Sequence, residues 1–217
     1  DGVRGGPITS VETLLVIDDQ CLQTTAGFEI ARLAGKEAIE NTVIAIFCLV
    51  NNARLFCRRK QVGQHSVWAN FMPLFHTAGC ATGVLGCLQA SCKMLLIKHF
   101  DANVFARLIE EQKVTTCFAV PTMLFNLLEV LEQNPRDMSS LEVITTGGAP
   151  VPPDLVRRVR DRLDCHLLSA FGQTEHSPMI SLNPVESTIE QIVETAGQPL
   201  PYTEVSIQLP ESNEVLP

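Results

Sequence analysis

From residue 93 onward, short apolar runs alternate with segments whose apolar residues recur at helical spacing. The runs predict strands at 94–97, 115–120, 141–145 and 165–170. Between them, Asp101 is expected to cap one helix, Pro121 to begin a second, and Pro152 and Pro153 to open a third. Strands separated by helices of this length imply right-handed βαβ units. The pattern therefore predicts an α/β fold with a largely parallel sheet flanked by helices.

The two ends of the chain follow other patterns. Near the N-terminus, Val11–Ile17 could be a strand and Ala26–Glu40 a helix. Near the C-terminus, Glu204–Leu209 alternates polar and apolar residues, as a half-exposed strand does. We therefore expect three regions: an unassigned α/β segment at 1–47, a core with the parallel sheet at 48–197, and the start of a truncated β subdomain at 198–217.

The composition of the chain mainly excludes classes of protein. A chain of 217 residues with 46% hydrophobic content can bury one sizeable core. A net charge of −8 argues against a nucleic-acid surface, which is normally basic. The apolar run Thr42–Val50 is far shorter than the roughly 20 residues that span a membrane. The eight cysteines form no Cys-x-x-Cys pair, which favours free thiols in the reducing cytoplasm.

A turn directly after the run at 165–170 places a hydroxyl beside a carboxylate, in the sequence Phe171–Glu175. The carboxyl ends of parallel strands are where open α/β sheets bind ligands. There Thr174 can donate to a phosphate oxygen, and Glu175 can hold Mg²⁺, which prefers oxygen ligands. An ordinary surface turn is the alternative for this segment taken alone.

Two upstream segments carry similar signals. After the run at 141–145, Gly147 and Gly148 permit close backbone approach ahead of a helix, which suits a planar base or an anion. The alternative is a connection that merely needs a tight turn. Earlier, His76 follows an apolar run in the segment Pro73–Gly79, where a satisfied structural histidine is the alternative reading.

In this order and spacing, Pro73–Gly79, Thr145–Pro150 and Phe171–Glu175 resemble core motifs of the adenylate-forming (AMP-dependent) synthetase superfamily. The resemblance is closest to its fatty and aromatic acyl-CoA ligases. The segment Thr195–Val205 resembles the stretch that follows these motifs, and the likeness runs from about Leu49 to Pro217. It implies that the chain is the central part of the large N-terminal domain of such an enzyme.

The resemblance implies ATP-dependent activation of a carboxylic acid through an acyl-adenylate, with CoA as the acceptor. It places Thr174 on phosphate, Glu175 on Mg²⁺ and His76 beside the acyl carboxylate, as the three catalytic residues. The segment around His76 has no carboxylate to pair with an ammonium group, which favours a plain acid over an amino acid. The residues that the resemblance assigns to ATP or AMP are Thr146, Gly147, Gly148, Ala149, Pro150, Phe171, Gly172, Gln173 and Thr174.

The chain also departs from the family. Ahead of the segment matching Val50–Ala53, members carry a Ser/Thr/Gly-rich phosphate loop, whereas Ala31–Phe47 has one Gly, no Ser and no Pro. The family's ribose-binding aspartate and C-terminal catalytic lysine have no match. We therefore expect a truncated core that is weakly active or inactive alone. The alternatives are a non-catalytic nucleotide-binding or interaction protein and, more remotely, a dinucleotide-dependent dehydrogenase, against which the lack of Gly-x-Gly-x-x-Gly counts.

Overall fold

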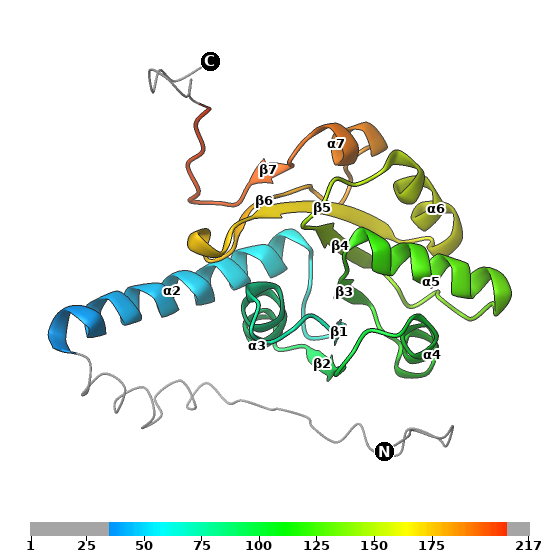
Figure 1. Ribbon diagram of the computed structural model, residues 1–217, viewed down its shortest axis with the longest axis horizontal. Coiled ribbons are helices and arrows are strands. Elements are labelled where there is room, and N and C mark those ends of the chain that lie inside the picture. Colours follow the sequence, from blue (N-terminus) through cyan, green and yellow to red (C-terminus); the bar gives the residue numbers. More distant parts are fainter. Residues whose placement is uncertain (1–34, 208–217) are drawn as a thin grey trace.

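The computed structural model describes residues 35–207, and their side chains from residue 46 onward. A seven-stranded sheet runs through the centre of this region. Helices α2 and α3 cover one face of the sheet, and α4, α5 and α6 cover the other (Figure 1). This three-layer arrangement is the one that an alternating pattern of strands and helices predicts.

The strand order in the sheet is β2-β1-β3-β4-β5-β6-β7. Neighbours from β2 to β5 are parallel, whereas β6 and β7 join antiparallel. The prediction of a largely parallel sheet is confirmed, and the four predicted strands form as β2 to β5. The strands are β1 (Val67–Asn70), β2 (Lys93–Leu96), β3 (Thr116–Phe118), β4 (Val143–Gly147), β5 (His166–Gly172), β6 (Met179–Leu182) and β7 (Gln198–Pro199).

The predicted helix starts are found where the sequence places them. The Asp101 carboxylate accepts a hydrogen bond from the Val104 N–H at 2.9 Å and so caps α4. Pro121 is the first residue of α5, and Pro152 precedes α6, which begins at Pro153. The helices are α2 (Gly35–Arg59), α3 (Gly86–Ala90), α4 (Ala102–Gln112), α5 (Pro121–Gln133), α6 (Pro153–Leu163) and α7 (Ile189–Glu194), with a π-helix η2 (Ala78–Leu85) and a 3₁₀ turn η3 (Thr174–His176).

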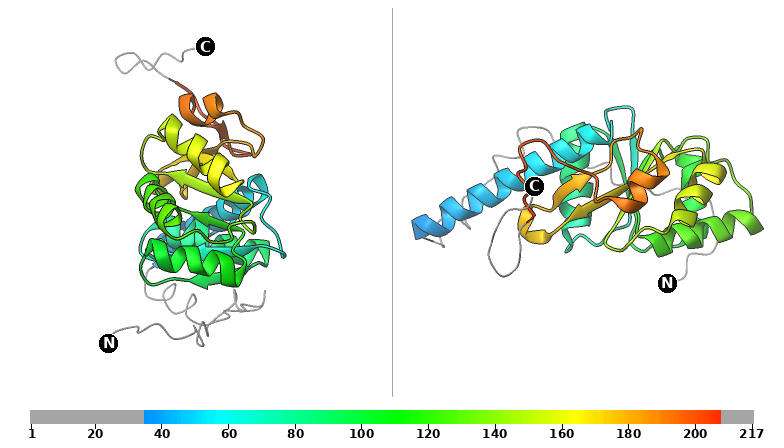
Figure 2. Two further views of the ribbon diagram at one scale, coloured as in Figure 1. Left: turned by 90° about the vertical axis from the view of Figure 1, so that its right-hand side faces the viewer. Right: turned by 90° about the horizontal axis from the view of Figure 1, so that it is seen from above.

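The helices pack on the sheet through two hydrophobic clusters. The larger one lies under α4, α5 and α6 and includes the fully buried Ile109, Leu127 and Leu155. The smaller one lies under α2 and α3 and includes Phe56 and Trp68. Each helical layer therefore packs on the sheet through its own core. The turned views in Figure 2 show the sheet between the two helical layers.

The predicted strand at Glu204–Leu209 is wrong for residues 204–207, which have no regular secondary structure. Alternation marks a chain that can form a strand, but a strand also needs a ladder partner, and none of the described strands pairs with this segment. Residues 208–209 and the possible strand at 11–17 lie outside the described residues. Helix α2 begins at Gly35 and runs unbroken past residue 47. Within residues 35–207, no helix is both long and apolar enough to cross a membrane.

Candidate active site

A cavity of about 280 Å³ opens at the carboxyl ends of β4 and β5. Four stretches of chain meet there: the loop after β1, the residues that follow β3, the end of β4, and the turn between β5 and β6. They are brought together because parallel strands all end at the same edge of the sheet. The lining residues are Met72, His76, Thr77, Ala78, Phe118, Val120, Gly147, Gly148, Ala170, Gly172, Gln173, Thr174, Pro178 and Met179.

The end of β4 presents bare backbone to this cavity. A Cβ on Gly147 would lie 2.6 Å from the carbonyl oxygen of Ala170, so β4 and β5 approach too closely there for a side chain. Gly148 has φ of +79°, and a Cβ there would have nothing within 4 Å. Glycine thus serves two needs at adjacent positions, close packing at the first and a left-handed backbone at the second.

The other residues predicted at this loop lie elsewhere. Thr146 is fully buried inside β4, and its hydroxyl has no hydrogen-bond partner within the described structure. Ala149 and Pro150 are exposed and do not line the cavity. Of the sequence-predicted residues on this side, the structure therefore brings only the two glycines to the cavity wall.

The turn between β5 and β6 supplies the polar part of the wall. The Gln173 N–H donates to the Pro178 carbonyl at 2.8 Å, which closes the turn. Gly172 fits beneath it because a Cβ there would lie 2.2 Å from the same carbonyl oxygen. Gly172, Gln173 and Thr174 line the cavity, whereas Phe171, with 47% of its surface exposed, and the exposed Glu175 do not.

His76 reaches the cavity from the loop before η2. Its Nδ1 accepts a hydrogen bond from the Ala78 N–H at 3.0 Å. With Nδ1 acting as an acceptor, the neutral ring carries its proton on Nε2, which leaves that N–H available to a ligand. His76 is the one titratable side chain among the lining residues.

The apolar walls of the cavity were not predicted. Met72, Phe118, Val120 and Met179 line it from three different parts of the chain. Phe118 and Val120 stand at the end of the predicted strand 115–120, and that position was a signal that they face the same edge as the two glycines. Nothing local in the sequence marks Met179, which belongs to the antiparallel strand β6.

Helix α2 fixes the position of Met179 in the cavity wall through two hydrogen bonds. The Asn52 Nδ2 donates to the Met179 carbonyl at 2.7 Å, and the Met179 N–H donates to the Asn52 Oδ1 at 3.0 Å. The Asn52 side chain is buried, so both bonds are shielded from water. One amide side chain therefore satisfies both main-chain groups of a cavity residue and fixes β6 against α2.

Glu175 is the carboxylate predicted to hold a metal. No cluster of three or more His, Cys, Asp or Glu residues suited to a metal occurs among the residues that the structure describes. Mg²⁺ commonly binds through one or two carboxylates and takes its remaining ligands from phosphates and water. Glu175, beside Thr174 at the cavity rim, fits that pattern only when a phosphate is also present.

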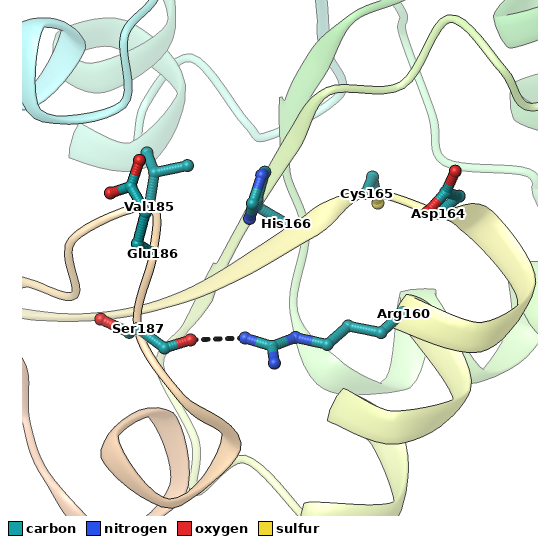
Figure 3. Close-up of a pocket in the computed structure, with 7 residues that line it drawn as sticks. All are labelled: Arg160, Asp164, Cys165, His166, Val185, Glu186 and Ser187. Carbon is teal, nitrogen blue, oxygen red and sulfur yellow. Dashed lines mark hydrogen bonds between the residues drawn. The ribbon is translucent and has the colours of Figure 1, made fainter.

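A second cavity, of about 310 Å³, lies at the opposite end of β5 (Figure 3). Arg160 of α6 donates there to the carbonyl oxygen of Ser187, across from His166 at the start of β5. This bond ties α6 to the loop that leads into α7. We interpret the arginine as a brace of the fold, since its guanidinium is engaged by main chain.

Comparison with known proteins shows the family to which the chain is similar. The family model for "AMP-binding enzyme" matches residues 42–217. The medium-chain fatty-acid–CoA ligase of Escherichia coli is 26% identical over 220 residues, which cover 97% of this chain and 38% of that protein. The acyl-CoA ligase cnsG of Penicillium expansum is 30% identical over 161 residues, 73% of this chain and 34% of its own.

Solved structures agree. A long-chain-fatty-acid–CoA ligase from Archaeoglobus fulgidus superimposes with a TM-score of 0.69 at 26% identity, covering 78% of this chain and 35% of that one. The o-succinylbenzoate–CoA synthetase of Bacillus subtilis, solved with ATP and a magnesium ion, gives a TM-score of 0.69 at 25% identity, covering 78% and 34%. The chain spans about a third of the length of the relatives it matches.

Proposed function

Because the chain belongs to the AMP-binding enzyme family, within the adenylate-forming acyl-CoA synthetases, we propose that it is the nucleotide- and acyl-binding core of an ATP-dependent acyl-CoA ligase. The observation that carries this proposal is the cavity at the ends of β4 and β5. There His76, the Gly147–Gly148 loop and the Gln173–Thr174 turn, which come from three separate motifs, meet around one space.

The proposed reaction has two steps. A carboxylate oxygen of the acid attacks the α-phosphorus of ATP, and pyrophosphate leaves with the electrons of the broken P–O bond. The CoA thiol then loses its proton, attacks the acyl carbon and displaces AMP. Both steps gather negative charge around phosphate, which fixed donors at the site must stabilise.

The residues of this chain fit those needs. The bare backbone at Gly147 and Gly148 allows a planar adenine to approach the end of β4 closely. The Thr174 hydroxyl donates to a phosphate oxygen, and the Nε2–H of His76 donates to the acyl carboxylate. Glu175 would hold Mg²⁺, which supplies neutralisation of phosphate charge when it is bound.

The lining of the cavity supports a plain carboxylic acid as the substrate. Met72, Phe118, Val120 and Met179 provide apolar surface, and the described residues that line the space include no lysine, arginine or carboxylate. A charged acyl body would lose its hydration there without gaining a partner. We therefore propose a fatty or aromatic acid rather than an amino acid.

A second candidate is a non-catalytic nucleotide-binding or interaction protein derived from the same family. The observation that favours it is α2, whose helical backbone occupies residues 35–59, including the place where a phosphate loop is expected. Pyrophosphate release measured with a panel of medium-chain, long-chain and aromatic acids separates the two. Acid-dependent release supports the ligase. Nucleotide binding by calorimetry without any release supports the second candidate.

The metal role predicts the behaviour of Glu175→Gln. An amide cannot replace a metal-binding carboxylate, and losing even an indirect partner of a metal ligand commonly costs about 10–100-fold in affinity. We expect calorimetric titration to show MgATP affinity falling by at least about tenfold, with AMP affinity in the absence of metal unchanged. Glu186→Gln, a change of another exposed glutamate at the opposite end of β5, is the control and should bind MgATP normally. Equal MgATP affinity in both variants would remove Glu175 from the proposal.

A further inference from the structure

A buried lysine and three cysteine thiols, those of Cys57, Cys87 and Cys92, lie together between α2, α3 and the sheet, apart from the residues that line the active-site cavity. The Lys60 side chain is fully enclosed, and its Nζ lies 4.1 Å from the centroid of the Trp68 ring. It donates to the Cys117 carbonyl at 3.3 Å. The titratable groups that act on Lys60 are all thiols, those of Cys57, Cys87, Cys92 and Cys117.

The end of α3 brings two of these thiols together. The Ser91 N–H donates to the Leu88 carbonyl at 3.2 Å, and the Cys92 N–H donates to the Cys87 carbonyl at 3.1 Å. Ser91 itself is left-handed, with φ of 53°. These three features define a Schellman ending, in which the residue after the left-handed one packs against a residue of the last helical turn. Here those two residues are Cys92 and Cys87.

The two thiols differ in pKa and in exposure, as a reactive pair of thiols requires. Interaction with the Cys87 side chain lowers the pKa of the Cys92 thiol against the opposing effect of burial, and the charge of Lys60 lowers it further. Interaction with Cys92 and burial raise the pKa of Cys87. Cys92 is half-exposed, whereas Cys87 is 4% exposed, so reagents in solution reach the more acidic thiol first.

We propose that Cys92 and Cys87 form a peroxide-sensitive dithiol, with Cys92 as the sulfur that is oxidised and Cys87 as the sulfur that resolves it. The Cys92 thiolate attacks one oxygen of a hydroperoxide, the O–O bond breaks, and the leaving oxygen departs as water or an alcohol after taking up a proton. The resulting sulfenic acid is attacked by the Cys87 sulfur, which loses its proton. An S–S bond forms, and the sulfenic oxygen leaves as water.

The folded chain favours this disulfide over others. Disulfides join residues whose Cα atoms are about 4.4–6.8 Å apart, and the main-chain bond between Cys92 and Cys87 already holds the two backbones together. Cys57 and Cys117 are buried, and burial raises the pKa of each thiol to about 12, so neither competes as a thiolate. The charge of Lys60 lowers the pKa of all four thiols, and burial outweighs this effect at Cys57 and Cys117.

The test treats the whole 217-residue chain with hydrogen peroxide below one equivalent and maps the products by mass spectrometry. We expect a loss of about 2 Da, located to a Cys87–Cys92 cross-link and reversed by a dithiol reductant. Cys92→Ser should abolish the cross-link. Cys87→Ser should leave a sulfenic acid on Cys92 that a cyclic 1,3-diketone traps.

Cys80→Ser is the matched control, because Cys80 is also half-exposed and lies in η2, outside the Schellman ending. It should form the Cys87–Cys92 cross-link at the wild-type rate, within about twofold. Peroxide that consumes other thiols while Cys87 and Cys92 remain unlinked would overturn the proposal. So would equal trapping of sulfenic acid at Cys48, Cys80 and Cys92. None of these readouts depends on ligase activity.

Discussion

At the scale of single residues, the burial of the Lys60 ammonium group is costly. An ammonium group that is fully buried loses its hydration, and here it recovers only one carbonyl bond and the faces of two aromatic rings. Burial accordingly lowers the pKa of Lys60 to about 8. The same thiols that receive its charge keep it from falling further.

This shift predicts how Lys60→Met changes stability with pH. As pH rises above about 8, the folded protein releases the Lys60 proton before the unfolded chain does, so the unfolded chain binds more protons. Stability contributed through Lys60 therefore rises with pH between about 8 and 10.5. Between pH 7 and pH 9, wild type should gain roughly 1 kcal/mol relative to Lys60→Met in urea unfolding.

The stability of wild type must be compared with that of the variant at each pH, because the buried thiols oppose the rise in stability with pH that is expected from Lys60. Burial raises the pKa of Cys57 and Cys117 to about 12, so their contribution to stability declines as pH passes the ordinary thiol value of 9. Lys98→Met, which removes an exposed lysine, controls for net charge and should show no such pH-dependent difference. A constant gap between wild type and Lys60→Met from pH 7 to 9 would contradict the prediction.

The loops of the site could be predicted from the sequence, but the residues of those loops that face the cavity could not. Gly147 and Gly148 could be anticipated there because a tight turn after a strand demands them. Thr146 looked equally suitable, yet β4 is a central strand with both faces covered, and Thr146 is fully buried inside it. Glu175 was predicted beside Thr174, and the two are neighbours, but only Thr174 lines the cavity. Their roles in binding nucleotide and metal stay predictions.

At the scale of elements, the active site depends on the contact between α2 and β6. The Asn52 amide satisfies the N–H and the carbonyl of Met179, and Met179 also pairs with Gly172 of β5. A helix from one side of the sheet thus positions the turn that carries Thr174. The link is polar and buried, so it specifies one register of α2 against β6 in addition to stabilising it.

Asn52→Ala should therefore damage both stability and the site. Removing the amide leaves two buried main-chain groups unpaired, at about 2–4 kcal/mol in the free energy of unfolding. Because Met179 lines the cavity, nucleotide affinity should fall as well. Urea unfolding and calorimetry measure the two effects.

The neighbouring Asn51→Ala is the control for this change. Its amide bonds to Arg54 and to the Phe47 carbonyl at the surface, so the loss should stay within about 0.5 kcal/mol. A similar cost for the two variants would mean that the bonds to Met179 contribute little.

Elements with strong local signals could be predicted, and those without them could not. Asp101, Pro121 and Pro153 mark helix starts by their own chemistry, and the apolar runs at β2 to β5 are long enough to stand out. The apolar run of strand β6 is interrupted by Ser181, and its identity as a strand depends on the antiparallel partners on either side of it. Glu204 to Ile207 shows the converse, an alternating pattern without a partner to make it a strand.

At the scale of the whole molecule, the site lies where the sheet changes from parallel to antiparallel pairing. Strands β1 to β5 run parallel, and β6 then returns antiparallel through the turn at 173–178. The edge at which β3, β4 and β5 end is therefore closed on one side by that turn. The sequence predicts that these strand ends share an edge, but it does not predict the strand order. The order depends on the packing of helices that are distant in the chain.

Our last prediction concerns the chain as a catalyst. Residues 39–47 lie within the unbroken helix α2, beyond its first turn, so their N–H groups are bonded to carbonyls four residues earlier. They are not free to surround phosphates as a glycine-rich loop does. Losing one well-placed electrostatic group commonly costs on the order of 10²–10³ in rate. We therefore expect the 217-residue chain alone to bind AMP through its intact cavity, yet to form acyl-CoA at least about 100-fold more slowly than a full-length family member. The measurement is acyl-CoA formation from medium-chain and long-chain acids and from benzoate, with AMP titration as the control for a folded site. Turnover comparable to that of a full-length ligase would show that phosphate is held by residues other than those of α2.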